Sequence, residues 1–213
     1  MAVRAPPAAR GTYRHGDLRR ALIEAGIALA RAGGPDAVVL REATRRAGVV
    51  PNAAYRHFAS RLDLLQAVRA AALARVADAM ESELAKLRRG RRPADFARAS
   101  LRAVGTGYLR FAAAESGLFR TAFVAPGPLS AAALPAAAGP GGLNPFELLG
   151  AALDRMVEAG VLARARRADA EYIAWSAVHG LAMLVIDGPL RGLGPAARRR
   201  LGRRLLDMVE NGL

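Results

Sequence analysis

The spacing of apolar residues is the feature that most constrains how this chain can fold. Leu18, Leu22, Ala25 and Leu29 recur at intervals of three and four residues, as the buried face of an amphipathic helix does. Similar spacing returns along most of the chain, and no segment keeps the period of two that a half-buried strand requires. The sequence therefore predicts an all-α fold.

Glycine and proline mark where these helices end. Gly33, Gly34 and Pro35 stop the first helix, and an arginine-rich break before Pro93 stops the fourth. We expect a long loop between Pro126 and Asn144, where proline, glycine and alanine predominate. The predicted helices cover residues 17–33, 40–47, 51–58, 60–87, 94–115, 116–124, 144–162, 169–187 and 195–211.

The chain is strongly basic, with a formal net charge of +14 and a pI near 11.6. Such a charge is typical of nucleic-acid binders, because cations that bind phosphates release condensed counterions. Lys86 is the only lysine, however, and high-GC coding bias alone would supply this much arginine. Charge by itself leaves both interpretations open.

Several kinds of chemistry are excluded by the residues that are missing. The sequence contains no cysteine, so it has no disulfide, thiolate nucleophile or cysteine-bound metal. His15, His57 and His179 are scattered and have no partners at metal-ligand spacing, and neither a Gly-x-Ser-x-Gly elbow nor a phosphate-binding glycine loop occurs. We expect no enzyme, no metal site and no cofactor.

The sequence also indicates where the protein acts. Residues 1–16 carry Arg4, Arg10 and Arg14 but lack the apolar core of a signal peptide. The best apolar stretch, 181–186, is far shorter than the roughly 18 residues of a membrane span. We expect a soluble, cytoplasmic protein with no membrane partner.

Two short helices around Gly48 form the segment most specific for function. Glycine readily adopts the left-handed conformation that a tight turn between helices needs. One face of the segment is apolar and consists of Leu40, Ala43, Ala47, Val49, Ala54 and Phe58. The other face is polar and consists of Arg41, Arg45, Arg46, Asn52, Tyr55, Arg56 and His57. This division suits a helix-turn-helix unit, although a helical hairpin with a solvated arginine face is the simpler alternative.

Five short motifs at fixed spacing extend this pattern over about 50 residues. They are Arg14-His15-Gly16-Asp17-Leu18, Leu40-Arg41-Glu42, Ala47-Gly48-Val49, Tyr55-Arg56-His57-Phe58 and Ser60-Arg61-Leu62-Asp63-Leu64-Leu65. Together they resemble the TetR family of bacterial transcriptional regulators. The resemblance implies a three-helix DNA-binding head at residues 14–66. Pro6, Pro7 and Gly11 indicate that residues 1–13 before it form a flexible basic arm. Residues 67–213 would form a helical bundle for dimerisation and ligand sensing.

The resemblance also implies which residues contact DNA. Arg41 matches a position that reaches a base edge, and Asn52 and Ala53 begin the recognition helix, where they could meet adenine and a thymine methyl. Tyr55, His57 and Arg61 match positions that hold phosphates. The complete expected set is Arg41, Thr44, Arg45, Pro51, Asn52, Ala53, Tyr55, Arg56, His57 and Arg61.

Three residues depart from the family's usual pattern. Val39 and Val50 stand where a serine or threonine often caps a helix or contacts phosphate, and valine can do neither. Thr44 replaces a small alanine between the two helices. Pro51 partly compensates, because its fixed φ suits the first position of a helix.

The predicted bundle carries a second motif. Residues 175–180, Trp-Ser-Ala-Val-His-Gly, resemble the Trp-His-Gly signature of one C-terminal subgroup of the family, supported by 108–111 and 118–120. We expect an effector pocket lined by Tyr108, Phe111, Phe119, Phe123, Phe146, Trp175 and His179. Simple core packing is the alternative for these aromatic residues.

The expected function is that of a ligand-released repressor. The last two long helices, apolar on more than one side at 172–186 and 201–209, would pair with a second copy and make a homodimer on a palindromic operator of double-stranded DNA. The alternative is an architectural DNA-coating protein that senses nothing. A cavity of several hundred Å³ in the body would favour sensing.

Overall fold

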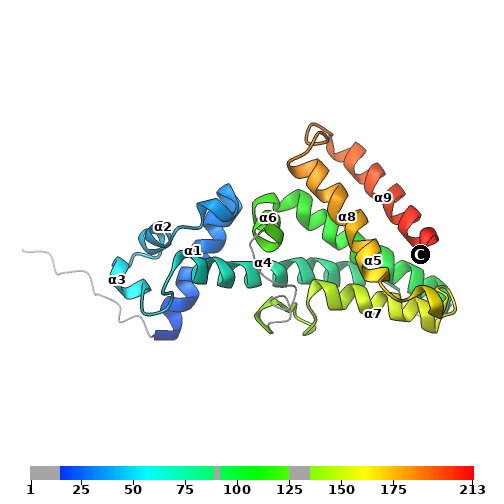
Figure 1. Ribbon diagram of the computed structural model, residues 1–213, viewed down its shortest axis with the longest axis horizontal. Helices are drawn as coiled ribbons and strands as arrows, with labels where there is room; N and C mark the ends of the chain where they lie inside the picture. The colour runs from blue at the N-terminus through cyan, green and yellow to red at the C-terminus, as the bar shows by residue number, and fades with distance from the viewer. Residues whose placement is uncertain (1–14, 89–91, 125–134) are drawn as a thin grey trace, which may run out of the picture.

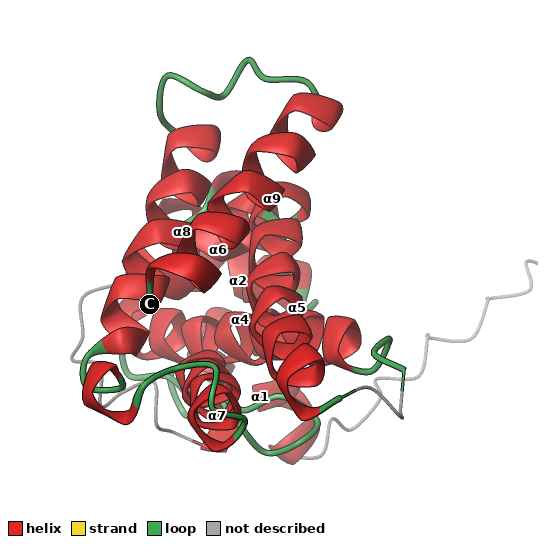
Figure 2. Ribbon diagram, turned by 90° about the vertical axis from the view of Figure 1, so that its right-hand side faces the viewer, coloured by secondary structure: helices red, strands yellow, loops and turns green. Residues whose placement is uncertain are grey.

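The computed structural model describes residues 15–88, 92–124 and 135–213, so the expected arm at 1–13 lies outside the described residues. Over these ranges the fold is all-α, without a strand, as predicted (Figures 1 and 2). The α-helices are α1 His15–Gly33, α2 Leu40–Arg46, α3 Pro51–Ala54, α4 Arg61–Leu84, α5 Pro93–Ala114, α6 Ser116–Val124, α7 Pro145–Glu158, α8 Ala170–Ile186 and α9 Pro195–Gly212.

The head consists of α1, α2, α3 and the beginning of α4. Gly48 has a φ of +68°, and the amides of Gly48 and Val49 donate to the carbonyls of Arg45 and Thr44. This pair of bonds is the Schellman motif that ends α2, which confirms the predicted left-handed turn. Leu40, Ala43, Ala54 and Phe58 are buried beneath it.

Helix α3 is four residues shorter than the predicted helix 51–58. Tyr55 caps its C-terminus, and the amides of His57 and Phe58 both donate to the carbonyl of Ala54. The chain turns there because Phe58, only 2% exposed, must point back into the core. The turn leads to Ser60, whose side chain accepts from the Asp63 amide while the Asp63 carboxylate accepts from the Ser60 amide, a capping box that begins α4.

Helix α4 runs without interruption from the head into the body (Figure 1). At the head end, Leu64 and Val68 are fully buried, and a Cβ added at Gly26 of α1 would lie 2.5 Å from Val68 Cγ2. At the body end, Val76 and Met80 are buried in the same hydrophobic core. The expected boundary at residue 66 therefore falls inside one helix, and the head and body share it.

Helices α5 to α9 form the body around the second half of α4. Helices α8 and α9 lie side by side at its outer edge (Figures 1 and 2). Helix α7 begins with a capping box between Asn144 and Glu147, but ends at Glu158 rather than at the expected residue 162. Gly160, with a φ of +68°, accounts for the earlier end, because a left-handed residue cannot continue the helix.

Candidate functional site

The exposed face of the head brings together most of the residues expected to contact DNA. Arg41, Arg45, Asn52 and Arg56 are exposed, and the Tyr55 side chain is 59% exposed. Ala53 and His57 are half-buried. The head thus presents an aromatic residue, an amide and three guanidinium groups over a buried apolar back, the division that a unit docking into a DNA groove requires.

The two helices of this face begin without side-chain caps. Val39 and Val50 occupy the N-cap positions of α2 and α3 in extended conformation and make no capping hydrogen bond, as predicted. Pro51 stands in the first turn of α3, where its missing amide costs nothing. The amides at the start of α2 therefore lack the acceptor that a serine there would supply.

Thr44 does not lie on this face, contrary to expectation. It is 1% exposed, and its hydroxyl donates to the carbonyl of Arg41 at 2.7 Å. The hydroxyl thereby replaces the hydrogen bond it would lose on burial, which allows threonine to occupy a position between helices. Thr44 packs the head and cannot reach a phosphate in this conformation.

Two of the arginines expected to contact DNA already have protein partners. The Arg45 Nε donates to Glu42 at 2.9 Å, and this hydrogen bond lowers the pKa of the Glu42 carboxyl. The Arg61 guanidinium donates to the carbonyls of Val38 at 2.8 Å and Pro35 at 2.9 Å. Arg61 thus ties the start of α4 to the segment before α2, and its contact with phosphate stays a prediction.

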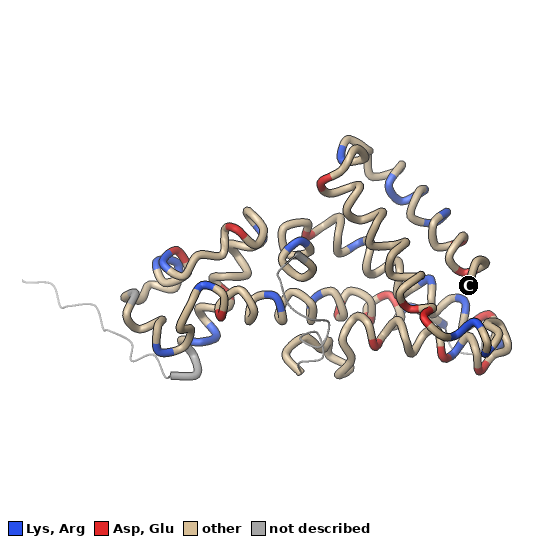
Figure 3. The backbone as a smooth tube through the Cα atoms, viewed as in Figure 1, with Lys and Arg blue, Asp and Glu red and all other residues tan. Residues whose placement is uncertain are grey.

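Positive charge is spread over the molecule rather than gathered on the head. Cationic residues lie on the head, along α9 and at the far end of the body (Figure 3). Net charge is accordingly poor support for the position of the DNA-binding surface. The arrangement of Asn52, Tyr55 and the turn at Gly48 is the better guide.

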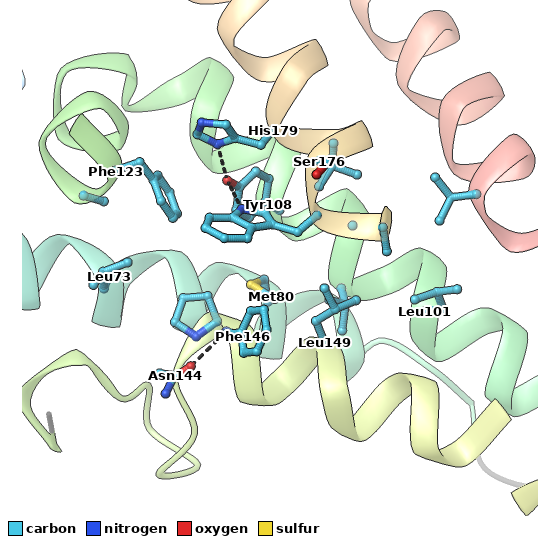
Figure 4. Close-up of a pocket in the computed structure, with 18 of the residues that line it drawn as sticks. Leu73, Met80, Leu101, Tyr108, Phe123, Asn144, Phe146, Leu149, Ser176 and His179 are labelled. Atoms are coloured by element: carbon cyan, nitrogen blue, oxygen red, sulfur yellow. Dashed lines mark hydrogen bonds between the residues drawn. The ribbon is translucent and has the colours of Figure 1, made fainter. Parts of the chain in front are cut away.

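The body contains a cavity of about 320 Å³ between α4, α5, α7 and α8 (Figure 4). Five of the seven residues expected in a pocket line it: Tyr108, Phe123, Phe146, Trp175 and His179. Phe111 and Phe119 do not, which corrects the prediction for these two. Phe119 is fully buried and stacks against the His179 ring from outside the cavity, and Phe111 is buried in the core.

Three polar side chains of the cavity wall are joined by hydrogen bonds. The Trp175 Nε1 donates to the Tyr108 hydroxyl at 3.1 Å, and that hydroxyl lies 2.8 Å from His179 Nδ1 (Figure 4). Burial raises the pKa of Tyr108 and lowers that of His179, so both are neutral near pH 7. This group of side chains offers polarity without charge.

Sequence reasoning missed other residues of the cavity wall, among them Arg69, Arg102, Asn144 and Ser176. The position of Arg69 in the cavity wall could have been inferred from its spacing in the sequence. It stands between Leu65 and Leu73 at intervals of four, and thus in the middle of an apolar stripe of α4. A residue inside such a stripe lies on the buried face of its helix, so the spacing alone indicates that Arg69 is buried.

None of the helices in the described ranges is long and apolar enough to cross a bilayer. The same ranges contain no group of three or more His, Asp or Glu side chains that could hold a metal ion.

Comparison with solved structures shows how widely this fold occurs. A protein of unknown function from Rhodococcus sp. RHA1 is 26% identical with a TM-score of 0.73, covering 96% of this chain and 99% of its own. The transcriptional regulator FadR from Bacillus subtilis, solved with stearoyl-CoA, is 12% identical with a TM-score of 0.63, covering 91% and 98%. The TetR family regulator PfmR from Thermus thermophilus is 23% identical with a TM-score of 0.58, covering 91% and 95%. The last two show the fold alone.

Two family models match the chain, whereas no curated protein does. Residues 22–68 match the model of bacterial regulatory proteins of the tetR family, and 101–209 match a tetracyclin repressor-like C-terminal domain. The first match covers the helix-turn-helix and the second most of the body, including much of the cavity wall. The narrower Trp-His-Gly subgroup stays a prediction. The chain belongs to the TetR family of DNA-binding transcriptional regulators, which are not enzymes.

Proposed function

We propose that the protein is a homodimeric repressor that binds a palindromic operator and leaves it when a small molecule occupies the body. The cavity beside the aromatic residues of α5, α6 and α8 is the observation that carries this proposal. An architectural protein that only coats DNA needs no such space. The double-stranded operator would be bound through Arg41, Asn52, Ala53, Tyr55 and their neighbours on the head, and repression follows the habit of the family.

The outer edge of the body supports a dimer. Tyr172 and Ile173 on α8, 47% and 61% exposed, are joined by Leu184 at 44% and Met208 of α9 at 59%. Large apolar side chains gathered on two adjacent helices favour contact with another protein surface. A second copy related by a two-fold axis would bury the same residues on both subunits and place two heads about one DNA turn apart.

Helix α6 connects the cavity with the head. Phe123 near its end lines the cavity, while Glu115, just before its start, accepts from Arg31 of α1 at 3.0 Å. A Cβ added at Gly117 would lie 2.2 Å from the carbonyl oxygen of Ala30, so the backbones of α1 and α6 are in direct contact. A ligand that displaces Phe123 would therefore move α6 against the head. Release follows if the ligand binds the displaced conformation better than the DNA-competent one.

The cellular location follows from this proposal, and the fold agrees with it. A regulator of bacterial genes acts where the chromosome lies, so we propose that the protein is cytoplasmic. FadR of Bacillus subtilis, which has this fold, was solved with stearoyl-CoA, which shows that the fold can hold a small molecule.

A gel-shift titration with the DNA upstream of the protein's own coding region tests the proposal, supported by selection of binding sites from random duplexes. We expect a palindromic site, two subunits per site and affinity that falls as salt rises, because phosphate contacts release counterions. Binding that shows no sequence preference in the selection would favour the architectural alternative. Binding to no duplex at all would refute both.

A further inference from the structure

Arg69 is a buried cation in the wall of the cavity. It is 8% exposed and extends from α4, between the buried Leu65 and Leu73. An arginine in such surroundings is costly unless a negative charge or a full set of acceptors compensates it. The residues around it provide neither.

The only hydrogen bond of Arg69 within the described ranges runs from Nε to the carbonyl of Ala122, at 3.1 Å. A guanidinium has five N–H donors, and no carboxylate of the described residues lies within ion-pair distance of it. The carbonyl belongs to the last turn of α6, where the helix dipole contributes about half a negative charge. Arg69 is thereby oriented, but its charge is only partly compensated.

Arg102 is the other arginine of the cavity wall, and the protein itself compensates its charge. Its guanidinium pairs with both Glu210 and Asp207 of α9. Arg102 is thus already neutralised by the protein, whereas Arg69 is not. The remaining polar groups of the wall, Tyr108 and His179 among them, are uncharged. Within the described residues, the cavity wall therefore has one positive charge that the protein compensates only in part.

We propose that the effector is a compact, mostly apolar carboxylic acid whose carboxylate pairs with Arg69 while its body lies against Phe123, Phe146 and Trp175. This inference rests on the proposed function, because it takes the cavity as the effector site. A carboxylate matches the planar fork of a guanidinium with two parallel hydrogen bonds.

Charge and volume favour this class over other anions. A phosphate monoester carries close to two negative charges at neutral pH, and a single cation would leave one of them uncompensated in an apolar site. The volume of about 320 Å³ stands at the lower end of the roughly 300–1,000 Å³ typical of small-molecule sites. The cavity thus fits a short free carboxylic acid better than an acid joined to a large carrier group.

The single tryptophan of the chain, Trp175, reports on the cavity directly. Its fluorescence is titrated in the full-length protein with three carboxylates, 3-phenylpropionate, cyclohexanecarboxylate and hexanoate, and with the matched primary amides. Hexyl phosphate is the comparison anion. We expect at least one acid to bind with a Kd below about 1 mM and about tenfold or more tighter than its amide, because hydrogen bonds to charged groups are the stronger ones.

Arg69→Gln should abolish this preference for the acid, and Arg75→Gln is the matched control. Arg75 lies on the same helix, outside the cavity wall, and pairs with Glu24 at 3.4 Å. Thermal unfolding of Arg69→Gln and Arg75→Gln checks that both variants are folded at the temperature of the titration. A modest fall in the melting temperature of Arg69→Gln is expected, because the variant loses the hydrogen bond from Arg69 Nε to the Ala122 carbonyl.

The proposal is overturned if no acid binds below about 1 mM, if amides or hexyl phosphate bind as tightly as the acids, or if Arg69→Gln keeps the preference. Operator binding by the same preparations is measured separately. Intact DNA binding alongside any of these results would leave the regulator function standing and refute only the ligand class.

Discussion

Asn52 and Tyr55 stand three residues apart on the exposed face of the head, yet they are assigned different tasks. Asn52 lies in α3, where an amide can read an adenine edge, and Tyr55 caps the end of the same helix with an exposed side chain. We expect Tyr55→Ala to weaken binding to every duplex by about tenfold, since it removes a phosphate contact. Asn52→Ala should instead relax preference at one base step, by about 1–3 kcal/mol.

Competition gel shifts with single-base operator variants measure both effects. Tyr55→Phe is the control for the hydroxyl alone, because it keeps the ring. Equal loss of affinity on all sequences for both alanine variants would contradict the assignment.

His179 makes stability depend on pH. Burial lowers its pKa in the folded protein, so between the folded and unfolded values the unfolded chain binds the proton more readily. The stabilisation is therefore complete above the unfolded pKa of about 6.5 and is lost as the pH falls through the folded value. Denaturant unfolding from pH 8 to pH 5 should show a steeper loss of stability for the wild type than for His179→Gln. Parallel curves would mean that His179 titrates normally.

At the scale of elements, the N-terminus of α2 lies at the surface of the head and has no side-chain cap. Its N-cap, Val39, is 42% exposed, has extended backbone angles and makes no capping bond. Val39→Ser should add one and raise the free energy of unfolding by about 1 kcal/mol. Ser60→Ala, which removes the capping box of α4, should lower it by a similar amount. Urea denaturation followed by circular dichroism measures both, and a Val39→Ser protein no more stable than the wild type would show that the cap does not form.

The long helices could be predicted from the sequence because each repeats its apolar stripe over several turns, as α4 does from Leu64 to Met80. The end of α3 could not, since a helix of one turn has no periodicity and the burial of Phe58 decides where it stops.

The cavity was predictable in part for a related reason. Aromatic residues indicate a hydrophobic body, but they do not tell how far along α6 the cavity extends. Phe119 and Phe123 share one face of α6 and their ring centroids lie 4.9 Å apart, yet only Phe123 lines the cavity. The spacing of Arg69 indicates burial but not that α6 covers it, because that contact joins segments 53 residues apart and no local pattern contains it.

At the scale of the whole molecule, the exposed apolar residues of α8 and α9 predict the oligomeric state. Ile173→Glu would place a charge within the proposed dimer contact, where its desolvation has no compensation. Light scattering should then report a monomer in place of a dimer, and operator affinity should fall with it. Leu62→Glu is the control for the light-scattering measurement alone, because Leu62 is 51% exposed but lies on the head, next to the expected DNA contact Arg61. A dimeric Ile173→Glu protein would move the interface elsewhere.

In the proposed repressor, the continuity of α4 would determine how small a rearrangement of the body is enough to release DNA. With a rise of about 1.5 Å per residue, its 24 residues make a rigid lever of about 36 Å. A tilt of only about 5° at the body end would carry the head end through about 3 Å, and in the proposed two-fold dimer the distance between the two heads would change by about 6 Å. That change is large compared with the distance of about 34 Å between the two half-sites of an operator. In the proposed dimer, a small effector would thus misplace both heads on the operator through a slight tilt of α4, with the head itself left intact.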